Sequence, residues 1–203
     1  MSESGIYSTI SKPSQGLYKE KGSKFLSFAF PITTTEQANE ILGRLRKKHH
    51  SAKHHCYAYR IKGPVTDLIR ANDDGEPSNT AGKPILGQID SFGLMNVLIV
   101  VVRYFGGTLL GKGGLIQAYK SASANALKKA EIIQVEPSGI FQITADYKNI
   151  KEVMRIAGTE GCEIISSDYN DNIVIKTKIL ASKSAGIISR FKRIGGIKID
   201  ISK

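Results

Sequence analysis

The stretch Asn96–Leu115 reads NVLIVVVRYFGGTLLGKGGL and joins an almost wholly apolar run to a segment rich in glycine. An apolar run of this length, followed by turn-forming residues, predicts a strand buried on both faces, which we place over Asn96–Phe105. Gly106–Gly114 should then form a loop, and the alanine-rich residues 115–130 favour a helix. This strand, loop and helix form the centre of a first domain.

Further elements of the first domain lie on the N-terminal side of this stretch. Two strands joined near Lys21 and Gly22 are predicted within Gly16–Phe30. Thr33–Glu36 has the pattern of a capping box and should begin a helix that ends near Lys48. The remaining predicted elements are a strand over residues 56–62, a candidate strand over 65–71 and a helix over 80–92.

A second domain begins at Pro137-Ser138-Gly139, which interrupts two periodic segments. We therefore divide the chain into domains of residues 1–136 and 137–203. Apolar periodicity in the second domain predicts the order β-α-β-β-α-β, which is that of ferredoxin-like α+β domains. The predicted strands cover 139–146, 162–167, 173–180 and 197–201, and the helices cover 147–158 and 182–194.

Composition and charge predict a cytoplasmic protein that meets polyanions. The two cysteines, Cys56 and Cys162, form neither a disulfide framework nor a zinc site, which fits a reducing compartment. The longest apolar run, Val97–Val102, is too short to cross a membrane, and the N-terminus does not resemble a signal peptide. The formal net charge of +11 is spread over both domains, with +7 in residues 1–136 and +4 in residues 137–203. Such a field attracts nucleic acid, although it also serves solubility.

The glycine-rich loop is the first candidate site. Gly106 and Gly111-Lys112 have the spacing of a phosphate-binding loop that opens a helix. The residue after the lysine is Gly113, where a nucleotide triphosphatase needs a Ser or Thr hydroxyl for magnesium, so that activity is not expected. Two readings remain open, which are binding of a backbone phosphate or simple anion and a purely structural turn.

The acidic loop is the second candidate site, since Asp73, Asp74 and Glu76 lie within four residues. Three carboxylates could hold magnesium, but the EF-hand pattern fails at Arg70 and Ala81. The alternatives are a solvated turn, contact with Arg103 or Lys83, and docking to a basic partner.

All four histidines fall within His49–His55. A structural zinc site is not expected, because adjacent side chains on a strand point in opposite directions. His54 is the one candidate for a hydrogen-bond donor or general base, and a structural histidine is the alternative. No nucleophile motif is present. We therefore expect no resident metal and no cofactor.

Several long motifs resemble the IMPACT family in its bacterial YigZ-like branch. They are Asp73–Pro84, Val100–Leu115, Ala52–Arg60 and Glu20–Phe25. The resemblance implies that the first domain has the fold of domain 2 of ribosomal protein S5 and that the second resembles a domain of elongation factor G. It also implies a link to translation, because eukaryotic members regulate initiation. Val102 and Gln117 depart from the family pattern, and Gln117 removes a cation from the helix that follows the loop.

The leading hypothesis is a translation-associated binding protein rather than an enzyme. Its basic face would contact RNA, the ribosome or a translation factor, and would consist of Arg60, Lys83, Arg103, Lys112 and His54 with Gly106, Gly107, Gly111 and Gly113. One alternative is a hydrolase or transferase in which Asp73, Asp74 and Glu76 hold a metal and His54 moves a proton. The other is a module for protein interaction. The oligomeric state stays open.

Overall fold

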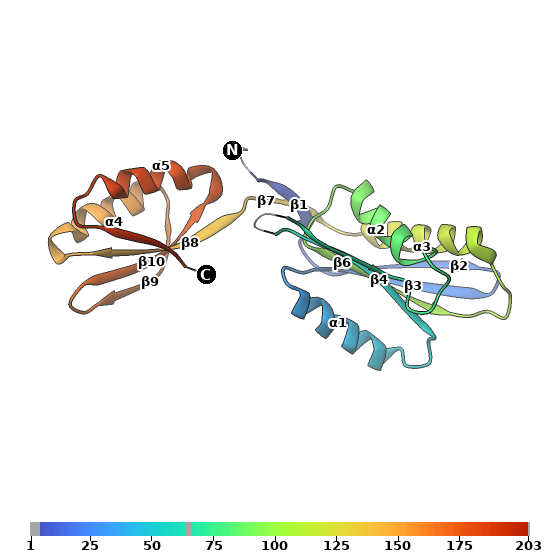
Figure 1. Cartoon of the computed structure of the whole chain (residues 1–203). Coiled ribbons are helices and arrows are strands. Elements are labelled where there is room, and N and C mark those ends of the chain that lie inside the picture. The colour runs from blue at the N-terminus through green and yellow to red at the C-terminus, as the bar shows by residue number, and fades with distance from the viewer. Residues whose placement is uncertain (1–4, 64–65, 203) are drawn as a thin grey trace. The chain divides into compact units, whose positions relative to one another are not determined.

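The computed structural model describes residues 5–63 and 66–202, which divide into two compact units (Figure 1). Tyr7–Gln134 form the larger unit, and the described residues 5–6 and 135–202 form the smaller one. This division lies two residues before the boundary that we place at residue 136. Helices of the described residues are all too short or too polar to cross a membrane.

A five-stranded antiparallel sheet forms the centre of the larger unit, with the strand order β2-β3-β6-β4-β5. The strands are β2 (Ser14–Glu20), β3 (Ser23–Pro31), β4 (His54–Ile61), β5 (Leu68–Asn72) and β6 (Val97–Tyr104). Helix α1 lies on one face, and α2 and α3 lie on the other (Figure 1). They span Thr35–Lys48, Gly82–Ser91 and Gly111–Leu127. The sequence does not predict β1 (Tyr7–Ile10) and β7 (Ile132–Val135), which pair with each other.

The apolar run of the sequence is the central strand β6, as predicted. Every residue of Val97–Val102 has 0% exposed surface, because successive side chains enter the cores on opposite faces of the sheet. Burial of each such side chain contributes roughly 1.5–3 kcal/mol. The same alternation continues beyond the run, so Arg103 points to the face of α2 and α3 and Tyr104 to the face of α1.

Helix α3 begins at Gly111, four residues earlier than the sequence predicts. Gly111–Gly114 therefore form its first turn, and only residues 105–110 are loop. Glycine has a low helix propensity, but tertiary packing outweighs it here. Leu115, Ala118, Tyr119 and Ala122 are all buried in the core between α3 and the sheet.

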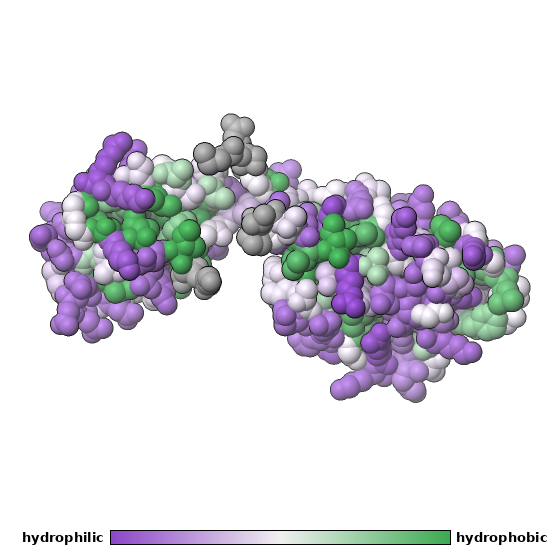
Figure 2. All heavy atoms as spheres, viewed as in Figure 1, coloured by the Kyte–Doolittle hydropathy of each residue, from purple (hydrophilic) through white to green (hydrophobic). Residues whose placement is uncertain are grey.

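Helix α1 is capped one residue later than predicted. Thr34 is the N-cap, and its hydroxyl accepts a hydrogen bond from the N–H of Gln37 at 3.3 Å. The side-chain oxygen of Gln37 in turn accepts a hydrogen bond from the N–H of Thr33, the residue before the N-cap, at 2.7 Å. Glutamine can serve as well as glutamate in such a box, which explains the shift from Glu36. The outer side of α1 is hydrophilic (Figure 2).

The smaller unit has the predicted order β-α-β-β-α-β. Its elements are β8 (Ser138–Ala145), a 3-10 turn (Tyr147–Asn149), α4 (Ile150–Thr159), β9 (Glu163–Tyr169), β10 (Ile173–Leu180), α5 (Ala181–Lys192) and β11 (Lys198–Ser202). The strands form one antiparallel sheet in the order β11-β8-β10-β9, with both helices on one face (Figure 1).

In the larger unit, the predicted strand over 65–71 is observed from Leu68 onward as β5, and its first position, Val65, lies outside the described residues.

Candidate anion-binding recess

The acidic loop between β5 and α2 holds its three carboxylates in three different directions. Asp73 caps α2, because its Oδ1 accepts hydrogen bonds from the N–H groups of Ala81 at 2.9 Å and Gly82 at 2.8 Å. Its Oδ2 accepts from the N–H of Asn79 at 2.9 Å. Asp73 therefore satisfies backbone donors that α2 would otherwise leave unpaired.

Asp74 ties the same loop to α1 and β4. Its Oδ1 lies 2.9 Å from a guanidinium nitrogen of Arg46, and its Oδ2 accepts from the N–H of His55 at 2.7 Å. The backbone of Asp74 is left-handed, with φ of 43°, a conformation that Asp tolerates better than most residues. Both oxygens are thus occupied within the chain.

Glu76 enters the core beneath the loop. Its Oε1 accepts from Arg103 Nη1 at 2.6 Å and from the Tyr119 hydroxyl at 2.8 Å. Contact between the acidic loop and Arg103 was one of the predicted alternatives and is confirmed. Arg103 therefore adds no net charge to the predicted basic face, because the buried carboxylate of Glu76 matches its charge.

Cys56 and Tyr119 complete the buried polar cluster. The Cys56 Sγ lies 2.9 Å from the carbonyl oxygen of Asp73 and 3.2 Å from the Tyr119 hydroxyl. Burial raises the pKa of both the Cys56 thiol and the Tyr119 phenol, so both stay protonated at neutral pH. A protonated, buried thiol is a hydrogen-bonding group rather than a nucleophile.

The prediction that Asp73, Asp74 and Glu76 hold a metal is wrong. Donors within the chain occupy oxygens of all three carboxylates, so the three groups cannot converge on one ion. Over the part of the chain that the structure describes, no cluster of three or more His, Cys, Asp or Glu side chains suits a metal. The acidic loop is a brace that fixes α2, β4 and β6 relative to one another.

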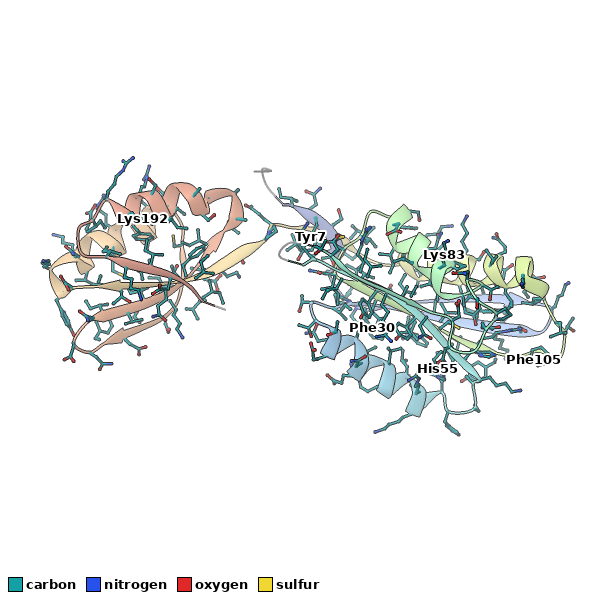
Figure 3. All side chains as sticks on the ribbon, in the orientation of Figure 1. Tyr7, Phe30, His55, Lys83, Phe105 and Lys192 are labelled. Carbon is teal, nitrogen blue, oxygen red and sulfur yellow. The ribbon has the colours of Figure 1, made fainter. Side chains whose placement is uncertain are left out.

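A recess of about 500 Å³ opens between this brace and the first turn of α3. It lies at the end of the larger unit where Phe105 is labelled in Figure 3. Its walls are mainly apolar and come from Pro77, Phe105, Leu109, Leu110 and Leu115. Its charged lining consists of three cations and one carboxylate: Lys53, Arg103, Lys112 and Glu76. The lining therefore has a net charge of +2 when His54 is neutral.

The polar groups of the recess are suited to an anion. Leu110, the N-cap of α3, makes no side-chain cap, so the N–H groups of Gly111, Lys112 and Gly113 have no partner within the helix and can serve a ligand. None of the ion pairs among described residues involves Lys53 or Lys112. His54 Nδ1 lies 2.9 Å from the Asp74 carbonyl and donates to it, which leaves Nε2 for a ligand.

Two cations predicted for the same face lie elsewhere. Arg60 pairs with Asp90 at 2.8 Å and Asp67 at 3.7 Å. It is six residues beyond His54 on β4, which corresponds to about 20 Å along the strand. Lys83 projects from α2 and does not line the recess (Figure 3). His54 and Arg60 lie near opposite ends of β4, and only the His54 end borders the recess.

Of the predicted glycines, Gly111 lines the recess and Gly113 lies in the adjoining turn. Gly106 has a packing role instead, because a Cβ there would lie 1.9 Å from the carbonyl carbon of Gly22 in the β2–β3 turn. Gly107 has a φ of 86° and provides the left-handed backbone that the loop requires.

Sequence reasoning missed one cation of the recess, Lys53, and its apolar walls, which include Phe105. Lys53 directly precedes His54, so the strand end that carries one should carry the other. Tyr119 was also missed, since a tyrosine in an alanine-rich helix has the pattern of an ordinary core residue.

Comparison with known proteins places the chain in a family. Residues 21–127 match the family model described as the Impact N-terminal domain. The chain belongs to the IMPACT family. An IMPACT family member of Haemophilus influenzae is 36% identical over 156 residues, which cover 75% of each chain. The IMPACT family member YigZ of Escherichia coli is 32% identical over 166 residues, or 81% of each chain.

A solved relative extends the likeness over both units of this IMPACT family member. A crystal structure described as that of a hypothetical protein matches with a TM-score of 0.75 and 28% identity. The match covers 100% of this chain and 99% of the other. The resemblance to the bacterial branch of the family and the two-part α+β architecture are thereby confirmed.

Proposed function

We propose that this protein binds RNA of the translation apparatus and that the recess receives one of its phosphate groups. One observation carries the proposal: the lining of the recess is positive, whereas the acidic loop beside it is neutralised from within. A phosphate therefore meets free amides and cations without a nearby unpaired carboxylate. Helix N-termini with glycine in the first turn are well suited to this role.

The chemistry of binding follows from the named groups. The N–H groups of Gly111, Lys112 and Gly113 point out of the helix end and can donate to phosphate oxygens. Lys112 and Lys53 supply charge, and their effect on affinity depends on salt because binding releases counterions. Apolar walls on the same recess exclude water and strengthen these contacts.

Membership of the IMPACT family is the reason why we propose a role in translation. The resemblance described from the sequence associates eukaryotic IMPACT members with regulation of initiation, and we extend that role to this chain as a binding protein of the cytoplasm. We further propose that the larger unit corresponds to domain 2 of ribosomal protein S5 and the smaller to a domain of elongation factor G. The β11-β8-β10-β9 order of the smaller unit, which is that of a ferredoxin-like sheet, supports this correspondence.

The test is RNA binding by the full chain at low and at physiological salt, measured by fluorescence anisotropy. Affinity should fall steeply with salt, and Lys53→Gln/Lys112→Gln should reduce the slope of log K against log [salt] by about 1.4–1.8. The matched control is Lys128→Gln/Lys129→Gln, which removes two exposed lysines at the other end of α3, about 25 Å away. Absence of binding at low salt, or an equal effect of the two variants, would overturn the proposal.

A further inference from the structure

Part of the sheet face on the α1 side has no helix over it. The side chains of Gln15, Leu17 and Lys19 on β2 point to this face, and all three are exposed. Their neighbours Gly16 and Tyr18 point to the other face and are at least partly buried there, where α3 packs against β2. The core beneath α1 draws its strand residues from β3, β4 and β6, so the helix leaves the β2 edge of the sheet uncovered.

Two rows of side chains cross the uncovered strands. Lys19 is directly opposite Lys24, which is in turn opposite Tyr104. In the next row Leu17 is opposite Leu26, which is opposite Val102. Like charges opposite each other destabilise a sheet, and no ion pair between described residues neutralises either lysine. The two lysines thus form an uncompensated positive pair on an open surface.

Tyr104 is held in place beside these lysines. Its hydroxyl lies 2.8 Å from Nδ1 of His49, the residue that ends α1. The His49 ring in turn packs between the rings of Tyr104, at 6.1 Å, and Phe28, at 5.4 Å between centroids. Only part of the Tyr104 side chain is buried, so an oriented aromatic surface remains accessible.

These groups line one groove of about 650 Å³. The lining includes Lys19, Lys24, Leu17, Leu26, Tyr104 and Phe105, and it contains no carboxylate. A flat strand surface that offers an aromatic ring and neighbouring cations is complementary to the unpaired bases and phosphates of a single strand. An acidic peptide would use the lysines and leave the aromatic ring unused, and a duplex would keep its base faces hidden.

We propose that this open face is a platform for single-stranded RNA. The platform consists of Leu17, Lys19, Lys24, Leu26 and Tyr104. An unpaired base stacks on Tyr104, and Lys19 and Lys24 contact the adjoining phosphates. The inference rests on the RNA binding proposed above and adds the form of RNA and a second surface. The groove and the recess lie on opposite faces of the sheet and share Phe105, which follows the end of β6.

The experiment compares a labelled oligouridine of about 12 nucleotides with a blunt duplex of equal length, both bound to the full chain. Tyr104→Leu removes the ring and should weaken binding of the single strand roughly five- to hundredfold, with little change for the duplex. Tyr104→Phe keeps the ring and loses only the hydroxyl, so it should bind nearly as the original protein does. Thermal unfolding of both variants checks that the fold is kept.

Substitution of Lys19 and Lys24 tests the platform independently of Tyr104. Lys19→Gln/Lys24→Gln should reduce the salt slope for the single strand by about 1.4, whereas Lys128→Gln/Lys129→Gln should leave it nearly unchanged. The platform is overturned if Tyr104→Leu and Tyr104→Phe bind alike, or if single strand and duplex weaken in parallel. If Lys53→Gln/Lys112→Gln weakens RNA binding and the platform variants do not, the platform is overturned and the proposed phosphate site in the recess stands. No RNA binding by the original protein would instead overturn the proposed function.

Discussion

Arg103 Nη1 lies 2.6 Å from Glu76 Oε1, and the side chains of both residues are more than nine-tenths buried. This ion pair joins the central strand β6 to the acidic loop. It removes one carboxylate from the rim of the recess and holds the loop that forms its wall. The Arg103 guanidinium also lies 5.4 Å from the Phe25 ring centroid and 5.6 Å from that of Phe105. The shape of the recess therefore depends on a buried charge pair that is part of its lining.

Glu76→Gln should lower the free energy of unfolding by about 3–5 kcal/mol, because it leaves the buried Arg103 charge without a counterion. Urea unfolding measures the loss. The double variant Glu76→Gln/Arg103→Gln should recover part of it, since the unpaired charge is then absent. Equal stability of Glu76→Gln and the original protein would show that the pair contributes nothing.

Alkaline pH should destabilise the protein through Cys56 and Tyr119. Burial raises the pKa of the thiol above its ordinary value of 9.0 and that of the phenol above 10.0. The unfolded chain releases these protons at the ordinary values, so their contribution to stability is complete below about pH 9 and is lost as pH rises. Unfolding by urea at neutral pH and at several values above 9.0 measures the decline.

Tyr119→Phe separates the two groups. The variant should be less stable at neutral pH by about 1–3 kcal/mol, because Glu76 loses a buried donor. Its stability should also decline less steeply above pH 10, because one titrating group is gone. A decline as steep as that of the original protein would assign the alkaline loss to other groups.

The two glycines Gly106 and Gly113 should respond oppositely to alanine. Gly106→Ala places a methyl group within 1.9 Å of the Gly22 backbone and should cost about 1–3 kcal/mol or more. Gly113→Ala meets no described atom within 4 Å and lies in a helical turn, so it should be neutral or stabilising by up to about 1 kcal/mol. Thermal unfolding of the two variants, side by side, tests the assignment of Gly106 to packing.

Lys19→Glu should raise stability while it lowers RNA affinity. The substitution replaces a like-charged cross-strand pair with an opposite pair, which contributes about 0.2–1 kcal/mol. Binding should weaken because one cation becomes an anion beside the phosphates. A parallel loss of stability and affinity would indicate that Lys19 serves the fold rather than a ligand.

Local patterns predicted most of the elements. The alternation of Ile173–Leu180 gives β10 with both ends correct, and the apolar run gives β6 within one residue. The short strands β1 and β7 were missed because the partners that fix them lie far away in the sequence: they pair with each other across more than a hundred residues. The first turn of α3 was missed because glycine disfavours helices unless packing imposes one.

The candidate site was only partly predictable. The sequence indicates Lys112, His54 and Gly111, which the structure brings to one recess. The exclusion of Arg60 depends on which end of β4 borders the recess, and the neutralisation of Arg103 depends on the path of the acidic loop. The open face at Lys19 depends on which strands α1 covers. These are properties of tertiary packing, and local periodicity does not encode them.

Titration of ¹⁵N-labelled protein with a short single-stranded RNA, followed by NMR, locates the contact. Binding of a phosphate at the recess should shift the backbone amide signals of Gly111, Lys112 and Gly113 saturably, and those of Lys128 and Lys129 should stay in place. Unchanged signals from the Gly111–Gly114 turn at saturating RNA would contradict the assignment of this recess to phosphate binding.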